Sequence, residues 1–106
     1  MDDIWPSIAW HLERWQGSEP LALTPGIRLL ERGLDLVGPD AAPDPVRWAQ
    51  VLDAGTGALA RLIELSQDSD VIVAEAASER AAVLVPLLTK MAGDSTQKLA
   101  RIWRSA

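Results

Sequence analysis

The chain contains no cysteine, no phenylalanine and no tyrosine, and it has a single histidine. Without cysteine it can form no disulfide, no thiolate zinc site and no cysteine nucleophile. This absence fits a reducing compartment, and we expect a cytoplasmic protein. A Ser–His–acid triad would depend entirely on His11. The residue inventory therefore argues against an enzyme, and we expect no catalytic residue, no cofactor and no metal.

Long apolar runs and a basic surplus are also missing. The longest apolar stretch, Ala81–Leu88, is far shorter than the roughly 20 residues that span a bilayer. The start, MDDIWPS, lacks the basic and apolar regions of a signal peptide. The net charge of −5 disfavours general binding to nucleic acid, which depends on neutralising phosphates. We therefore expect a soluble protein that binds neither membranes nor nucleic acid. The start at Met1 favours a whole gene product or an N-terminal domain.

The residues that are present favour helices. Leucine, alanine, valine, isoleucine and five tryptophans supply most of the apolar volume, and the alternation typical of strands is absent. A length of 106 residues is enough for one domain with its own core. We expect a single all-α domain over residues 1–106, a compact antiparallel bundle of about five helices. The expected helices span residues 4–16, 25–37, 45–66, 70–92 and 95–105.

Capping residues set several of these boundaries. Asp2 or Asp3 is expected to cap the first helix, and Gly17 to end it. Thr24 and Pro25 have the pattern of a cap followed by the first helical residue.

The glycines in DAGTG fall inside the third expected helix, which begins at the cap Asp44 and Pro45. An unbroken helix keeps its apolar residues on one face, so we expect no break. That face carries Trp48, Val51, Leu52, Leu59, Leu62 and Ile63. Gly55 lies at its centre, where the missing side chain would let another helix approach closely.

The fourth expected helix contains two irregular residues, Pro86 and Arg80. Pro86 removes one backbone hydrogen bond, so a kink is expected nearby, and Gly93 is expected to end the helix before a final one. Arg80 falls within the apolar face. It must reach the edge of the helix, pair with an acid or face a partner, because an unpaired buried charge is costly. The candidate acids are Glu31, Asp35 and Asp53.

Trp10 is the most unusual apolar residue of the first expected helix. At about 100° per residue, the apolar side chains of this helix form one stripe, and Trp10 points away from it. Tryptophan and arginine are the residues most enriched at the energetic centres of interfaces. We therefore expect a protein contact surface, for a partner or for a second copy in a homo-oligomer. Its expected residues are Trp10, His11, Arg14 and Ser7.

The favoured function is a non-enzymatic interaction module that acts as an adaptor, an inhibitor or a regulatory subunit. One alternative is a phosphotransfer or carrier protein that uses His11 or Ser69. The other is a bundle that binds a small molecule in a pocket near Trp48, Trp103 and Pro86. The sequence does not identify the partner.

Overall fold

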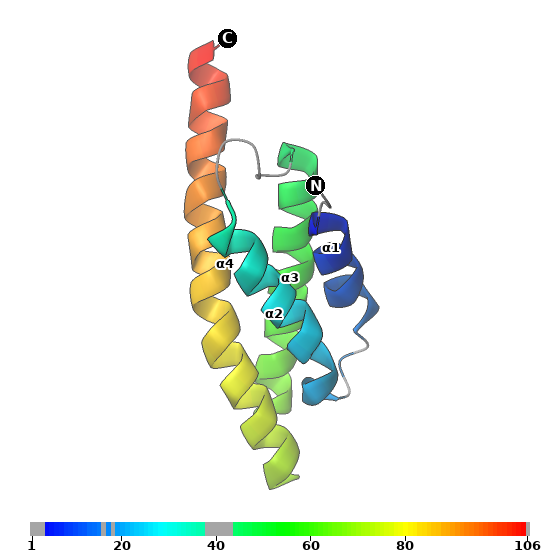
Figure 1. Cartoon of the computed structure of the whole chain (residues 1–106). Helices are drawn as coiled ribbons and strands as arrows, with labels where there is room; N and C mark the ends of the chain where they lie inside the picture. Colours follow the sequence, from blue (N-terminus) through cyan, green and yellow to red (C-terminus); the bar gives the residue numbers. More distant parts are fainter. Residues whose placement is uncertain (1–3, 16, 18, 38–43, 106) are drawn as a thin grey trace.

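The structure, a computed structural model, describes residues 4–15, 17, 19–37 and 44–105, with residues 94–105 as backbone only. In these ranges the chain forms α-helices, one short 3-10 helix and no strand, which confirms the all-α prediction (Figure 1). The elements are α1 (Trp5–Arg14), the 3-10 helix η1 (Pro20–Leu23), α2 (Thr24–Asp35), α3 (Pro45–Leu65) and α4 (Val71–Ser105).

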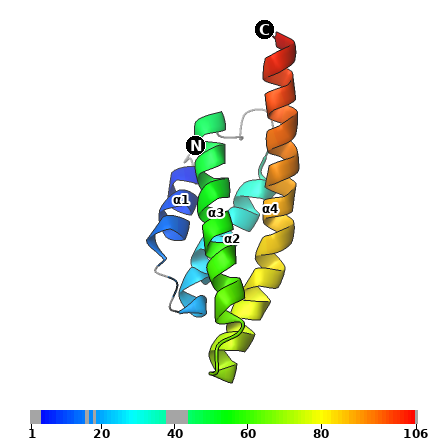
Figure 2. The same cartoon turned by 180° about the vertical axis from the view of Figure 1, so that it is seen from behind.

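The helices run alternately up and down and pack as a bundle. α3 and α4 form the long antiparallel pair, α1 packs against α3 and α2, and α2 packs against α4 (Figure 2). The bundle is compact apart from the C-terminal end of α4, which extends beyond the other helices in both views. At 1.5 Å per residue, the 35 residues of α4 account for the 52 Å long axis of the molecule.

The core lies where the four helices meet, and tryptophans from two of them are in contact there. The rings of Trp5 and Trp48 are 5.3 Å apart between centroids and tilted by 45°. The Trp48 indole Nε1 donates a hydrogen bond of 3.1 Å to the carbonyl oxygen of Met91. This bond satisfies the polar atom of a buried side chain and ties α3 to α4. The fully buried side chains of largest volume are Trp48, Ile8, Leu23, Leu30, Leu62, Leu84, Met91 and Val51.

The boundaries of α3 agree with the sequence prediction. The Asp44 side chain caps the helix by accepting a 2.8 Å hydrogen bond from the backbone nitrogen of Arg47. The helix passes through both glycines without a break. A β-carbon at Gly55 would lie 2.6 Å from a methyl carbon of Leu88, so glycine permits the expected close approach of α4. One residue of the predicted inner face, Ile63, is exposed.

The start of α2 differs from the prediction. Thr24 does not cap the helix. It is the first helical residue, since η1 runs directly into α2. Leu23 occupies the cap position in a helical conformation and makes no side-chain capping bond. A side-chain cap requires an extended residue before the helix, and η1 removes it. For α1, Ile4 occupies the cap position, while Asp2 and Asp3 lie outside the described residues.

The largest difference is in α4. The predicted helices at 70–92 and 95–105 are one continuous helix, so the described residues contain four α-helices rather than five. Gly93 does not take the left-handed conformation that ends many helices, and nothing in the fold packs against it. A glycine within a helix costs only about 1 kcal/mol relative to alanine, so the helix continues.

Pro86 is tolerated because it lies on the outer surface of α4. The proline removes the hydrogen bond to the carbonyl of Ala82, and both residues are exposed, so water can satisfy that oxygen. The helix bends in this region with its convex side away from the bundle (Figures 1 and 2). The predicted kink is thus a bend within an unbroken helix.

Candidate functional site

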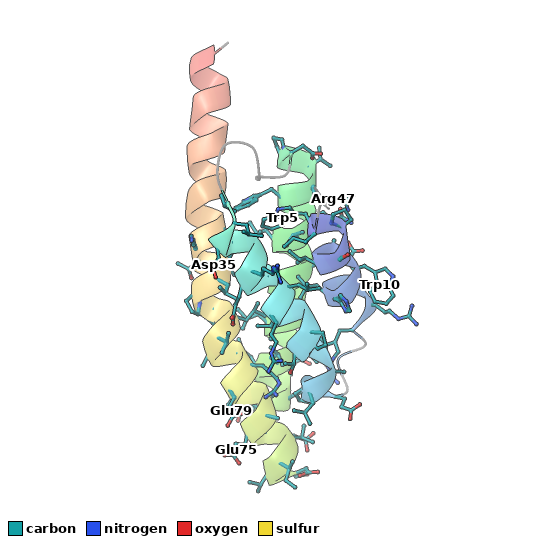
Figure 3. All side chains as sticks on the ribbon, in the orientation of Figure 1. Trp5, Trp10, Asp35, Arg47, Glu75 and Glu79 are labelled. Atoms are coloured by element: carbon teal, nitrogen blue, oxygen red, sulfur yellow. The ribbon has the colours of Figure 1, made fainter. Side chains whose placement is uncertain are left out.

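The indole of Trp10 lies on the outer face of α1. The buried side chains of the helix include Trp5, Ile8 and Leu12. Trp10 lies two residues from both Ile8 and Leu12, about 200° around the helix, and it is 51% exposed. Figure 3 shows Trp10 projecting away from the bundle and Trp5 pointing into it. The helical phase expected from the sequence is therefore correct.

Two neighbours on α1 contact the Trp10 ring. The guanidinium carbon of Arg14, one turn along the helix, lies 4.8 Å from the ring centroid in a cation–π contact. The His11 ring meets the indole edge to face, with centroids 4.9 Å apart and planes at 88°. Contacts of these kinds contribute about 0.5–1 kcal/mol each at exposed sites. The exposed indole therefore has a favoured orientation before anything binds to it.

Trp10 borders a surface groove of about 510 Å³. We call it the Trp10 groove. The first wall consists of Trp10, His11 and Arg14 of α1 and of Trp15, the residue that follows the helix. The second wall, from the segment that leads through η1 into α2, consists of Glu19, Ala22 and Pro25. The first wall is aromatic and cationic, and the second is aliphatic and anionic.

Hydrogen bonds from Trp15, which follows α1, and from α3 hold the segment that leads to the second wall. The Trp15 indole Nε1 donates to the Glu19 carbonyl oxygen at 2.8 Å. Arg61 Nε, on α3, donates to the Gly17 carbonyl oxygen at 2.7 Å. Gly17 has a φ of +76°, and a β-carbon there would lie 2.6 Å from Arg61 Cγ, so this position requires glycine. The second wall is therefore fixed by the fold itself.

Arg14 and Glu19 carry opposite charges in the Trp10 groove, yet they do not pair with each other. Within the described ranges neither side chain forms an ion pair, and the interaction of Arg14 is with the Trp10 ring. Among the described residues, the Glu19 carboxylate makes no hydrogen bond to another side chain, and its backbone carbonyl accepts one from Trp15. Both charges are available to a molecule that enters the groove.

The structure brings together three of the four predicted contact residues. Trp10, His11 and Arg14 line the Trp10 groove, whereas Ser7 is exposed on α1 but does not line it. Sequence reasoning missed the second wall and Trp15. Glu19 lies in the segment from Gly17 to Pro20, which has no periodicity, so nothing in the sequence placed it opposite Arg14.

The residues of the alternative hypotheses lie apart from one another. Ser69 is exposed in the turn before α4, while His11 is half-buried in the Trp10 groove. Trp48 is enclosed in the core and Pro86 lies on the outer surface, so these two do not line a common pocket. The side chain of Trp103 lies outside the described residues.

Arg80 lies in a second, smaller groove of about 210 Å³ between α2 and α4. Its side chain is 17% exposed, with Nη1 3.6 Å from a carboxylate oxygen of Glu79. Nε donates to the Thr24 hydroxyl at 3.1 Å, and Nη1 donates to the Ala76 carbonyl at 3.0 Å. The partner acid is thus the adjacent residue of α4. The predicted alternatives Glu31, Asp35 and Asp53 do not pair with Arg80.

The described residues contain neither a metal-binding cluster nor a membrane-spanning helix. No group of three or more histidine and carboxylate side chains there could hold a metal ion. None of the described helices combines the length and apolarity needed to cross a bilayer. No protein-family model, curated protein or solved structure matches this chain.

Proposed function

We propose that this chain is a non-enzymatic protein–protein interaction module and that its contact surface is the Trp10 groove. The observation that carries the proposal is the half-exposed indole, held by Arg14 at the border of a groove. Adaptors, inhibitors and regulatory subunits all act through such a surface.

The exposed part of Trp10 gives a partner a substantial gain in free energy. A tryptophan side chain buries roughly 200 Å² when it is enclosed, and about half of it is exposed here. Covering about 100 Å² of apolar surface contributes about 2.5 kcal/mol. This is the size of effect that defines an interface hot spot.

The neighbours of Trp10 add to this gain. Arg14 already restricts the indole, so little conformational freedom is lost when a partner covers it. His11, Glu19 and Arg14 supply polar groups around an apolar centre, which is the usual composition of a contact surface. A catalytic role has less support, because the chain has no cysteine or tyrosine and only one histidine.

Site-specific photocrosslinking tests the proposal. A photoreactive aromatic amino acid, which keeps a ring at the site, replaces Trp10 in the source organism, and the matched control carries it at Ile63, which is also half-exposed (54%) but lies on α3. We expect position 10, and not position 63, to give a discrete crosslinked protein, identified by mass spectrometry. The absence of any crosslink specific to position 10 would refute the proposal.

A further inference from the structure

We propose that the partner of the Trp10 groove is the same groove of a second copy of this chain, in a two-fold symmetric dimer. The inference rests on the proposed function and names its partner. It follows from the chemistry of the two walls, each of which complements the other.

A two-fold axis that runs along the groove, midway between its walls, explains how unlike walls would meet. Rotation by 180° places the α1 wall of each copy against the second wall of the other, so every contact occurs twice. The surface is then self-complementary if the two walls of one copy are complementary to each other in shape, apolar contact and charge. Both the apolar and the charged residues of the groove meet this condition.

The apolar contact joins Trp10 of one copy to Ala22 and Pro25 of the other. Ala22 and Pro25 are exposed and line the second wall. Alanine and proline lose no side-chain rotamer freedom when they are covered. The indole is restricted by Arg14, so the contact orders few groups on either side.

The charged contact joins Arg14 of one copy to Glu19 of the other, and symmetry makes two such pairs. Within one chain these side chains line the same groove without pairing with each other. A single copy therefore presents both halves of an ion pair on facing walls. An unrelated partner could bind by complementing the charge of only one of these two residues. A second copy complements both charges at once.

The net charge of −5 opposes self-association at long range, but the effect is screened beyond about 8–10 Å at physiological salt. The Arg14 and Glu19 charges cancel within the groove. The groove is lined by seven residues, fewer than the roughly 20–30 residues per side of a standard interface. We therefore expect a dimer dissociation constant of about 1–100 µM.

Analytical ultracentrifugation measures the first consequence. The wild-type chain is expected to dimerise, and Trp10→Ala to weaken the dimer at least about 30-fold, as a hot-spot residue does. Ile63→Ala removes a similarly exposed apolar side chain from outside the groove and should leave the dissociation constant unchanged. Circular dichroism establishes that each variant is folded.

Charge reversal gives a sharper test, which does not depend on Trp10→Ala. Arg14→Glu alone and Glu19→Arg alone place like charges opposite each other twice, so each should dimerise at least about tenfold more weakly. A mixture of the two variants restores both ion pairs and should form a heterodimer with near wild-type affinity. The controls Arg32→Glu and Glu75→Arg make the same charge changes at exposed positions elsewhere.

These experiments either support or overturn the proposed dimer. Rescue on mixing establishes reciprocal pairing of the two walls. A wild-type chain that is monomeric at millimolar concentration overturns the inference, and so does a dimer that none of the groove variants weakens. A monomer that still crosslinks a different protein through position 10 would overturn the inference and leave the proposed function standing.

Discussion

Two aromatic clusters lie on opposite faces of α1, and the same residue type has a different role in each. In the inner cluster, Trp5 packs against Trp48, whose indole nitrogen donates to a buried carbonyl. In the outer cluster, Trp10 is exposed to solvent and its ring contacts are with Arg14 and His11.

The difference shows how burial decides what a tryptophan contributes. The inner indoles are removed from water when the chain folds, so their transfer free energy contributes to the free energy of folding. The outer indole keeps about half of its surface in water, so that part of its transfer free energy is available only to an association. Substitutions should therefore separate stability from binding.

The largest expected effect comes from breaking the inner cluster. Trp48→Ala removes a buried side chain together with its contact to Trp5 and its hydrogen bond to Met91. We expect the free energy of unfolding to fall by about 3–5 kcal/mol, measured by urea denaturation. A loss below about 1 kcal/mol would show that this indole is not part of the core.

An intermediate effect is expected at Gly17, which positions the segment leading to the outer groove. Gly17→Ala forces a side chain into a left-handed backbone and against Arg61, so we expect a loss of about 1–2 kcal/mol. The matched control is Gly57→Ala, on α3, where a β-carbon meets nothing within 4 Å. It should stabilise the protein by about 0.4–1 kcal/mol. Urea midpoints of the two variants that shift in the same direction would contradict this account.

The smallest effect on stability is expected in the outer cluster. Trp10→Ala removes a half-exposed ring and its contacts with Arg14 and His11, but the higher helix propensity of alanine offsets part of this loss. The free energy of unfolding should therefore fall by only about 1 kcal/mol. The measurement is made at low protein concentration, where self-association does not contribute. A loss comparable to that of Trp48→Ala would place Trp10 in the core and remove the contrast between the clusters.

Periodicity was sufficient to predict the phase of α1 and the inner face of α3 apart from Ile63, which is exposed. The spacing of Ile8 and Leu12 placed Trp10 outside the core, and the phase of α3 predicted an unbroken helix through Gly55. These predictions were correct because burial of an apolar stripe is repeated over several turns, so that many residues agree.

Asp44 and Gly55 were predicted from single residues, but several other features that depend on single residues or on distant contacts were not. Glycine is common at helix ends, so Gly93 was predicted to end its helix. Its free-energy cost within a helix is small, and α4 continues through it. The wall containing Glu19 depends on the bond from Arg61 to Gly17, which joins residues 44 positions apart. Arg80 pairs with Glu79 of its own helix rather than with an acidic residue of α2 or α3.

The bonds that Trp15 and Arg61 make to backbone carbonyls also bear on the speed of recognition. A surface assembled by its own fold does not have to rearrange during an encounter. Its association rate is then set by diffusion and orientation, in the range of about 10⁵–10⁷ M⁻¹s⁻¹. Substitutions around Trp10 should accordingly act on how long a complex lasts and leave nearly unchanged how fast it forms.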